Sequence, residues 1–318
     1  MSATTIDPAT LTELPGKLEH YEVETGGYLT AGLAAAERAH GAALQSLLTE
    51  LTVLVIQPDA IARRQVDDCL AFVRQHGFEP IMAVPFHLTP EMSRALWRFQ
   101  FNAISEDSKA IGEGVYCFDL SLMLFLRDTR LTATVPRSSR LTAIKGSSDP
   151  SKRSPESLRS TLGAINRIFA NVHCPDEPLD ILRELAILTP EPALSQLHTR
   201  LAGAFQDGAA YDCRQEVDQV YAAIAAHDLH SERALARLRA DIERAGREHD
   251  AVAVAEKLLA MLHAAGQPGE TLDWLTFAGQ LRDLGIDPYG WDPLLVASNH
   301  IEYELPGVAK TIASFSGS

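Results

Sequence analysis

Long apolar runs are missing from this sequence of 318 residues. No stretch approaches the roughly 20 consecutive apolar residues that a membrane-spanning helix needs. The first sixteen residues are acidic and rich in proline and threonine, and they do not follow the basic and apolar pattern of a secretory signal peptide. We therefore expect a protein with no membrane partner that resides in the cytoplasm.

Cysteine is scarce, and the four cysteines stand singly with no C-x-x-C pair. Paired spacings are the usual sign of structural zinc sites and of redox motifs, and disulfides require an oxidising compartment. Free thiols in a reducing cytoplasm are the simpler interpretation. We accordingly predict no metal ion held by the protein's own side chains. The cysteines are Cys69, Cys117, Cys174 and Cys213.

Positive charge is also in deficit, with 28 Lys and Arg against 42 Asp and Glu and a formal net charge of −14. Because nucleic-acid binding needs a basic surface, this balance argues against DNA or RNA as a partner. One segment differs from this acidic balance, since residues 137–159 contain six basic residues and two acidic ones. A local basic excess suits a polyphosphate ligand, although a solvated loop can have the same composition.

The order of apolar segments predicts an α+β fold. Strands and helices follow one another as strand, helix, strand, strand, helix, strand, which is the split βαβ arrangement of the ferredoxin-like fold. Thr89 and Pro90 form a typical start for a helix after the second strand. The strands are expected at 51–57, 78–88, 115–126 and 165–172, and the helices at 60–76, from Thr89, and from an N-cap at Asp176.

The length of the chain predicts more than one domain. Residues 1–49 read as an N-terminal extension with a helix from about Leu29, and residues 50–189 contain the split βαβ pattern. Residues 190–318 are rich in alanine and leucine at helical spacing, which predicts an all-α domain. We expect a ferredoxin-like domain followed by this helical domain.

One stretch, 146–184, joins a polar loop to an apolar run and then to a helix. The run delivers His173 immediately before the helix, and Arg159 closes the loop. An imidazole in this position can act as a nucleophile toward phosphorus, while arginine and backbone N–H groups stabilise phosphate oxygens. The pattern therefore predicts a phosphoryl acceptor.

These residues resemble the nucleoside diphosphate kinase family over about 50–189. The family's Gly-x-Thr-x-Pro corresponds to 146–150, and its Pro-Gly-Thr-Ile-Arg corresponds to 155–159. Its catalytic Asn-x-x-His-Gly-Ser-Asp corresponds to 170–176, with Glu184 at the matching distance for a helical glutamate. The Lys-Pro-Asp that ends the family's first strand is Gln57-Pro58-Asp59 here.

The resemblance implies ping-pong phosphoryl transfer from ATP or GTP through a phosphohistidine at His173, with Glu184 holding the other ring nitrogen. Mg²⁺ would be carried by the nucleotide. Because members of the family usually assemble as oligomers, the resemblance also implies a homo-oligomer. By the same resemblance, the residues expected to contact nucleotide or phosphate are Gln57, Arg63, Trp97, Phe101, Arg140, Ser148, Arg159 and Asn171.

Departures from the family pattern leave two hypotheses open. Gln57 lacks the charge of the family lysine, Asn171 stands two rather than three residues before the histidine, and Cys174-Pro175 replaces Gly-Ser. The first hypothesis is a divergent phosphotransferase whose acceptor is a nucleoside diphosphate or another small molecule held by the helical domain. The second is a catalytically degenerate nucleotide-binding module whose helical domain binds a partner.

Overall fold

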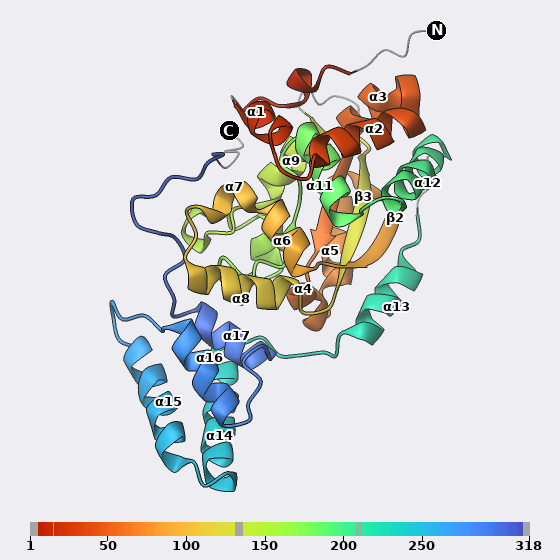
Figure 1. Ribbon diagram of the computed structural model, residues 1–318. Helices are drawn as coiled ribbons and strands as arrows, with labels where there is room; N and C mark the ends of the chain where they lie inside the picture. Colours follow the sequence, from red (N-terminus) through yellow and green to blue (C-terminus); the bar gives the residue numbers. More distant parts are fainter. Residues whose placement is uncertain (1–5, 15, 131–135, 208, 210, 314–318) are drawn as a thin grey trace.

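The computed structural model describes residues 6–14, 16–130, 136–207, 209 and 211–313. Its centre is a four-stranded antiparallel sheet with the strand order β2-β3-β1-β4, surrounded by helices (Figure 1). This strand order and the helices between the strands confirm the predicted ferredoxin-like α+β fold. The strands are β1 Leu51–Ile56, β2 Phe78–His87, β3 Leu120–Asp128 and β4 Val172–His173.

The strand β1 lies between β3 and β4 and is buried along its whole length. Its residues alternate between two apolar clusters, because successive side chains of a strand point to opposite faces. Leu54 and Ile56 belong to one cluster, and Val53 and Val55 belong to the other. The first cluster includes α4, α5 and α8, while the second includes α2, α3 and α11. These helices span α2 Tyr28–His40, α3 Leu44–Glu50, α4 Pro58–Ala62, α5 Val66–Gln75, α8 Glu106–Tyr116 and α11 Pro178–Leu188.

The register of β4 decides where His173 points. His173 pairs with Val55 and Val172 pairs with Ile56. Side chains of directly opposed residues lie on the same face, so His173 shares the face of Val55, which is the face that α11 covers. The next residue of the chain after β1, Gln57, donates its backbone N–H to Asn171 O at 2.9 Å. The ends of β1 and β4 therefore bring Gln57 and His173 together.

Two predicted elements have different bounds in the structure. The predicted helix 60–76 is two helices, α4 and α5, because the chain turns at Arg64, whose φ is 60°. The predicted strand 115–126 is wrong at its start, since Val115 belongs to α8 and β3 begins at Leu120. In contrast, the cap at Thr89 is confirmed, because its Oγ1 accepts a hydrogen bond from Met92 N at 3.3 Å.

The segment before β4 shows the largest difference between the predicted and the observed structure. Of the predicted strand 165–172, only Val172 lies in β4. The rest is a loop, because Asn166 Oδ1 accepts the backbone N–H groups of Ile168 and Phe169 at 3.0 and 2.9 Å and so competes with a strand ladder. The following helix begins at Pro178, with a capping box formed by Glu177 and Asp180, and not at the predicted Asp176.

The N-terminal residues pack closely on the rest of the protein. The helix α2 lies against α11 and against α12 (Ala193–Asp207), and a Cβ at Gly32 would stand 2.0 Å from Leu182 O. Only glycine permits the two backbones to approach so closely. The other helices up to β4 are η1 Pro8–Leu11, α1 Lys17–Glu22, η2 Gly41–Ala43, α6 Pro90–Leu96, α7 Arg98–Phe101, α9 Arg137–Lys145, η3 Pro150–Lys152 and α10 Leu158–Thr161.

Every described element after β4 is helical. Two of these helices, α12 Ala193–Asp207 and α13 Arg214–Ala223, pack against β2. The other four, α14 to α17, gather at one end of the protein, where α16 and α17 contact α8 (Figure 1). The division at 189 and 190 remains a prediction. These four helices are α14 Ser231–Glu248, α15 Val252–Ala265, α16 Trp274–Asp283 and α17 Trp291–Ser298.

The chain after α17 returns to the ferredoxin-like part as a strap, residues 299–313. Ser105 N donates to Tyr303 O at 3.1 Å, and Thr311 N donates to Phe99 O at 3.0 Å. An isolated β-bridge also joins Ile104 to Glu304. These bonds hold the strap beside α7 and the start of α8. Across the described ranges, no helix has the length and apolar character needed to cross a bilayer.

Candidate active site

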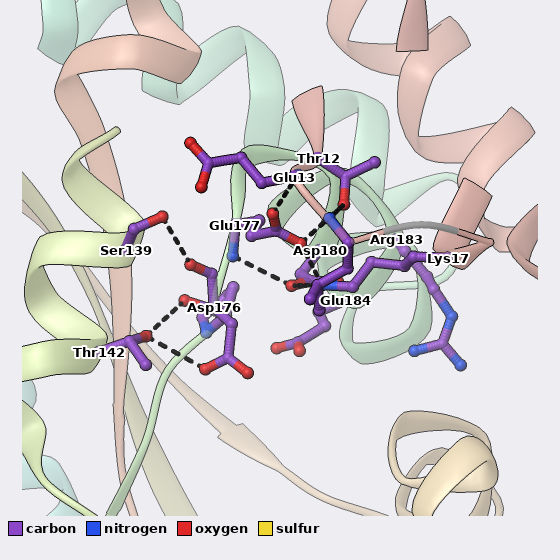
Figure 2. A network of polar contacts seen from close by, with 12 residues as sticks. Thr12, Glu13, Lys17, Ser139, Thr142, Asp176, Glu177, Asp180, Arg183 and Glu184 are labelled. Atoms are coloured by element: carbon purple, nitrogen blue, oxygen red, sulfur yellow. Dashed lines mark hydrogen bonds and ion pairs between the residues drawn. The ribbon is translucent and has the colours of Figure 1, made fainter. Parts of the chain in front are cut away.

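A cleft of about 700 Å³ opens beside the ends of β1 and β4. Its walls come from the N-terminal helix α1, from α7 and α8, from α9 and the loop that follows it, from α11 and from the strap. Side chains from both chain ends therefore complete a cleft whose floor belongs to the ferredoxin-like part. Figure 2 shows the polar network where α11 meets the N-terminal residues.

His173 and Glu184 form the pair at the floor of this cleft. The ring nitrogen Nε2 lies 2.8 Å from Glu184 Oε2, and the two side chains are 18% and 11% exposed. The edge of the imidazole faces Trp97, with ring centroids 5.7 Å apart and planes at 82°. A carboxylate accepts a hydrogen bond from N–H, so in the neutral form of the imidazole Nε2 is the nitrogen that carries the hydrogen. The lone pair is then on Nδ1, which is the nitrogen free to act as a nucleophile.

Arg159 is buried next to β4 and binds three backbone carbonyls. Its guanidinium donates to Ala170 O at 3.1 Å, to Gly146 O at 2.8 Å and to Val172 O at 2.6 Å. These bonds fix the loop after α9 against the residues that lead into β4. Burial lowers the pKa of Arg159, but a guanidinium stays ionised in proteins. Arg159 thus brings a charge close to His173 while its hydrogen bonds shape the cleft wall.

An acidic cluster at the start of α11 is neutralised by the N-terminal extension. Lys17 Nζ forms ion pairs with Glu177 and with Asp180, the latter at 2.9 Å, and all three side chains are buried (Figure 2). Tyr21 adds a hydrogen bond from its hydroxyl to Asp180 Oδ1 at 2.7 Å. Burial raises the pKa of Asp180 to about 6, while the Lys17 ammonium acts in the opposite direction and the Glu184 carboxylate adds to the rise.

A second polar group lies across the cleft, on α9 and the loop between β4 and α11. Thr142 Oγ1 donates to Asp176 Oδ1 at 3.1 Å (Figure 2). The same oxygen lies 3.2 Å from Cys174 Sγ. Burial raises the pKa of the Cys174 thiol. Cys174 is therefore a protonated, buried thiol and not a thiolate nucleophile.

Seven of the predicted site residues lie in the cleft. Gln57 is only 5% exposed, and its Oε1 has no hydrogen-bond partner among the residues that the structure describes. Leaving a buried oxygen without a hydrogen bond is costly, so the Gln57 side chain is not fully satisfied in this arrangement of the cleft. The seven are Gln57, Trp97, Phe101, Ser148, Arg159, His173 and Glu184.

The other three predicted residues point to protein partners elsewhere. Arg63 donates to Leu162 O and Gly163 O at 3.0 and 2.9 Å. Arg140 forms an ion pair with buried Asp128 at 2.6 Å and stacks over Phe78. Asn171 has a φ of 67°, and its amide nitrogen donates to Leu162 O at 3.0 Å. All three stabilise loops next to the cleft and do not line it.

Several cleft residues were not predicted as site residues. Lys145, the last residue of α9, lines the cleft and lies in the basic segment that the sequence did reveal. Lys17 and Tyr21 reach it from α1, and Tyr303 reaches it from the strap. No pattern in the sequence links these residues to the cleft, because their partners are far away along the chain. In the described part of the chain, no cluster of three or more His, Cys, Asp or Glu side chains is arranged to hold a metal ion.

Comparisons with known proteins give one similar sequence and several similar structures. No protein-family model matches the chain. The thioredoxin domain-containing protein 3 homolog of Heliocidaris crassispina is 26% identical over 157 residues, which are 48% of this chain. The chain spans 18% of the length of that curated relative.

The solved structures with a similar fold include nucleoside diphosphate kinases. The enzyme of Aquifex aeolicus is 18% identical with a TM-score of 0.38, and the match covers 45% of this chain and 97% of that one. The enzyme of Pyrobaculum aerophilum is 16% identical with a TM-score of 0.35, covering 46% and 98%. The ferredoxin-like fold itself follows from the strand order and register described above.

Proposed function

We propose that this protein is a phosphotransferase that moves the γ-phosphoryl group of a nucleoside triphosphate through a phosphohistidine at His173. The observation that carries the proposal is the His173–Glu184 pair, with Nε2 and Oε2 2.8 Å apart at the floor of a cleft. This pair sets the tautomer that a nucleophilic imidazole needs, and buried Arg159 brings positive charge to the same place.

In the first half-reaction, the lone pair of His173 Nδ1 attacks the γ-phosphorus. A nitrogen–phosphorus bond forms, and the bond from the γ-phosphorus to the bridging oxygen breaks. The electron pair leaves on that oxygen as part of the nucleoside diphosphate. The imidazole becomes more positive during the step, and the Glu184 carboxylate stabilises that charge through the hydrogen bond on Nε2.

In the second half-reaction, a terminal phosphate oxygen of the acceptor attacks the phosphoryl group. The nitrogen–phosphorus bond breaks and its electron pair returns to Nδ1, which restores the starting enzyme. The acceptor is a nucleoside diphosphate or a related small molecule. Tyr303, Glu304 and Lys310 of the strap line the same cleft, so residues outside 50–189 would contact this second substrate.

ATP or GTP would serve as donor, and Mg²⁺ would come with the nucleotide. In this proposal the ion is held mainly by the phosphate oxygens of the nucleotide, which are hard oxygen ligands of the kind that Mg²⁺ prefers. No step above depends on a protein-bound metal ion.

A second candidate function is a catalytically degenerate nucleotide-binding module whose helical region binds a partner. The observation that favours it is the orientation of Arg63 and Arg140. Arg63 donates its hydrogen bonds to backbone carbonyls, and Arg140 donates to Asp128, so neither side chain lines the cleft. Neutral Gln57 at the end of β1 removes a further charge from the cleft. Such a protein would bind nucleotide without transferring phosphate.

A transfer assay separates the two functions. The purified protein is given ATP labelled at the γ position, Mg²⁺ and unlabelled GDP, and labelled GTP is measured over time. We expect labelled GTP with the wild-type protein and none with His173→Asn, which keeps the size and polarity of the side chain. Equilibrium binding of ADP is measured on both proteins. Binding without transfer in the wild type would contradict the proposed function and favour the binding module.

A further inference from the structure

The cations of the cleft differ in how firmly other groups hold them. Lys17 is bound to Glu177 and Asp180, and Arg183 forms a two-bonded ion pair with Glu24 at 2.7 Å. These charges are already balanced by buried carboxylates at close range. They contribute little to the binding of an incoming anion.

Arg167 is balanced in the same way on the opposite side of the cleft. It forms ion pairs with Asp149 at 2.6 Å and with Glu304 at 3.0 Å. It therefore joins the loop after α9 to the strap and does not offer a free charge. Arg159 and Lys145 differ from these cations in position, because they bind the carbonyls of Val172 and Cys174, the two residues that flank His173.

Lys145 is buried yet loosely held. Its side chain is 8% exposed, and its Nζ lies 3.4 Å from Cys174 O and 3.6 Å from Asp176 Oδ1. Both distances are longer than those of a strong charge-assisted hydrogen bond, which run about 2.7–2.9 Å. Asp176 is itself a third exposed and already accepts a hydrogen bond from Thr142. The ammonium thus keeps donor capacity for a better acceptor.

The position of Lys145 suits a phosphate next to His173. Lys145 Nζ contacts the carbonyl of the residue that follows His173 in the chain. Lys145 ends α9, and Gly146 then turns the chain with a φ of 82°. A Cβ at that position would stand 2.5 Å from Ser157 Cβ, so the turn is tightly packed and holds the base of the lysine in place.

We propose that Lys145 binds the phosphates of the nucleotide and supplies from α9 the positive charge that Gln57 does not supply from the end of β1. The inference rests on the proposed function and assigns its phosphate-binding cation. Lys145 moves from Cys174 O and Asp176 toward the phosphate oxygens, and Gln57 contributes only a neutral donor from its amide.

Binding measurements test this inference without requiring transfer. The dissociation constant of ADP is measured by calorimetry for the wild type, Lys145→Gln, Lys145→Arg and a control, Lys257→Gln, at an exposed position on α15. We expect Lys145→Gln to weaken binding roughly tenfold or more, since a hydrogen bond to a charged group is lost. Lys145→Arg should weaken it less, and Lys257→Gln should leave it unchanged.

A charge relocation makes the test specific. Adding Gln57→Lys to Lys145→Gln should recover most of the lost affinity, because the ammonium returns to the cleft from β1. Neutralising the competitor with Asp176→Asn should tighten ADP binding in the wild type and have a smaller effect in Lys145→Gln, as coupled sites do. Thermal unfolding of each variant establishes that it is folded.

The outcomes separate the inference from the proposed function. Equal affinity of wild type and Lys145→Gln, with both proteins folded, would overturn the role of Lys145 even if His173 transfers phosphate. Loss of affinity in Lys145→Gln that Gln57→Lys restores would support the role even if the protein transfers no phosphate. A loss that Gln57→Lys does not restore would contradict the exchange of positions between the two residues.

Discussion

Replacing Glu184 by glutamine tests the central pair of the cleft with little change in shape. The amide oxygen of glutamine can still accept the hydrogen bond from His173 Nε2, which spans 2.8 Å in the structure. The tautomer of the imidazole is then kept, and only the negative charge is lost. The variant therefore isolates the electrostatic part of the contribution that Glu184 makes.

The expected size of the effect follows from the type of bond. A hydrogen bond to a charged group contributes about 1.5–3 kcal/mol and a neutral one about 1 kcal/mol, so the loss is about 0.5–2 kcal/mol. With a factor of ten in rate for every 1.36 kcal/mol, labelling of His173 should slow about 2- to 30-fold. Glu184→Ala should slow it further, because the orientation of the ring is lost as well.

The assay is a single turnover with labelled ATP in excess over enzyme, stopped at intervals and quenched in alkali, where phosphohistidine is stable. The affinity for ADP is measured in parallel and should change little, because Glu184 holds the histidine and not the nucleotide. If Glu184→Gln and Glu184→Ala both label at the wild-type rate, the carboxylate has no part in the chemistry and the reasoning fails.

Three further predictions concern stability. Lys17→Met should lower the free energy of unfolding by about 3–5 kcal/mol in urea titrations, because Glu177 and Asp180 lose their buried cation; a loss below about 1 kcal/mol would contradict this. Burial raises the pKa of Asp59 from 3.8 to about 6, because the buried site favours the protonated carboxyl. The stabilisation that this shift provides is complete below pH 3.8 and is lost as the pH rises through about 6. As the pH rises across that range, the free energy of unfolding of Asp59→Asn should increase by about 3 kcal/mol relative to that of the wild type, measured by urea titrations at each pH. If the free energies of unfolding of the two proteins change with pH in parallel, the pKa of Asp59 is not raised. Arg159→Lys should lower the unfolding midpoint, since one ammonium cannot reach the three carbonyls that the guanidinium binds; an unchanged midpoint would count against their importance.

The fold could be predicted because its signals are local. The apolar run of β1 and the Thr89–Pro90 helix start each depend on neighbouring residues in the chain. The errors arose where side chains override the local pattern. Asn166 holds an apolar segment in a loop, and Arg64 adopts a left-handed conformation between two helices that read as one. Neither effect is visible in hydrophobic periodicity.

The pairing of His173 with Glu184 was predictable because one short segment supplies both residues. His173 and Glu184 are separated by eleven residues, the spacing across which β4 and α11 fold against each other. In contrast, the ion pair of Lys17 with Asp180 joins residues 163 positions apart, and sequence spacing contains no information about it. The sequence also did not show which basic residues line the cleft, since Arg140 and Lys145 both lie in the same basic segment. Only the structure places the first beside Asp128 and the second in the cleft.

The most direct test of the central claim is to locate the phosphoryl group on the protein. The wild-type protein is incubated with ATP and Mg²⁺, digested under alkaline conditions, and analysed by mass spectrometry for phosphorylated peptides. We predict one phosphoryl group on His173, formed together with an equal amount of ADP and removed on addition of GDP. A protein that binds ATP but acquires no phosphoryl group on His173 would contradict the account.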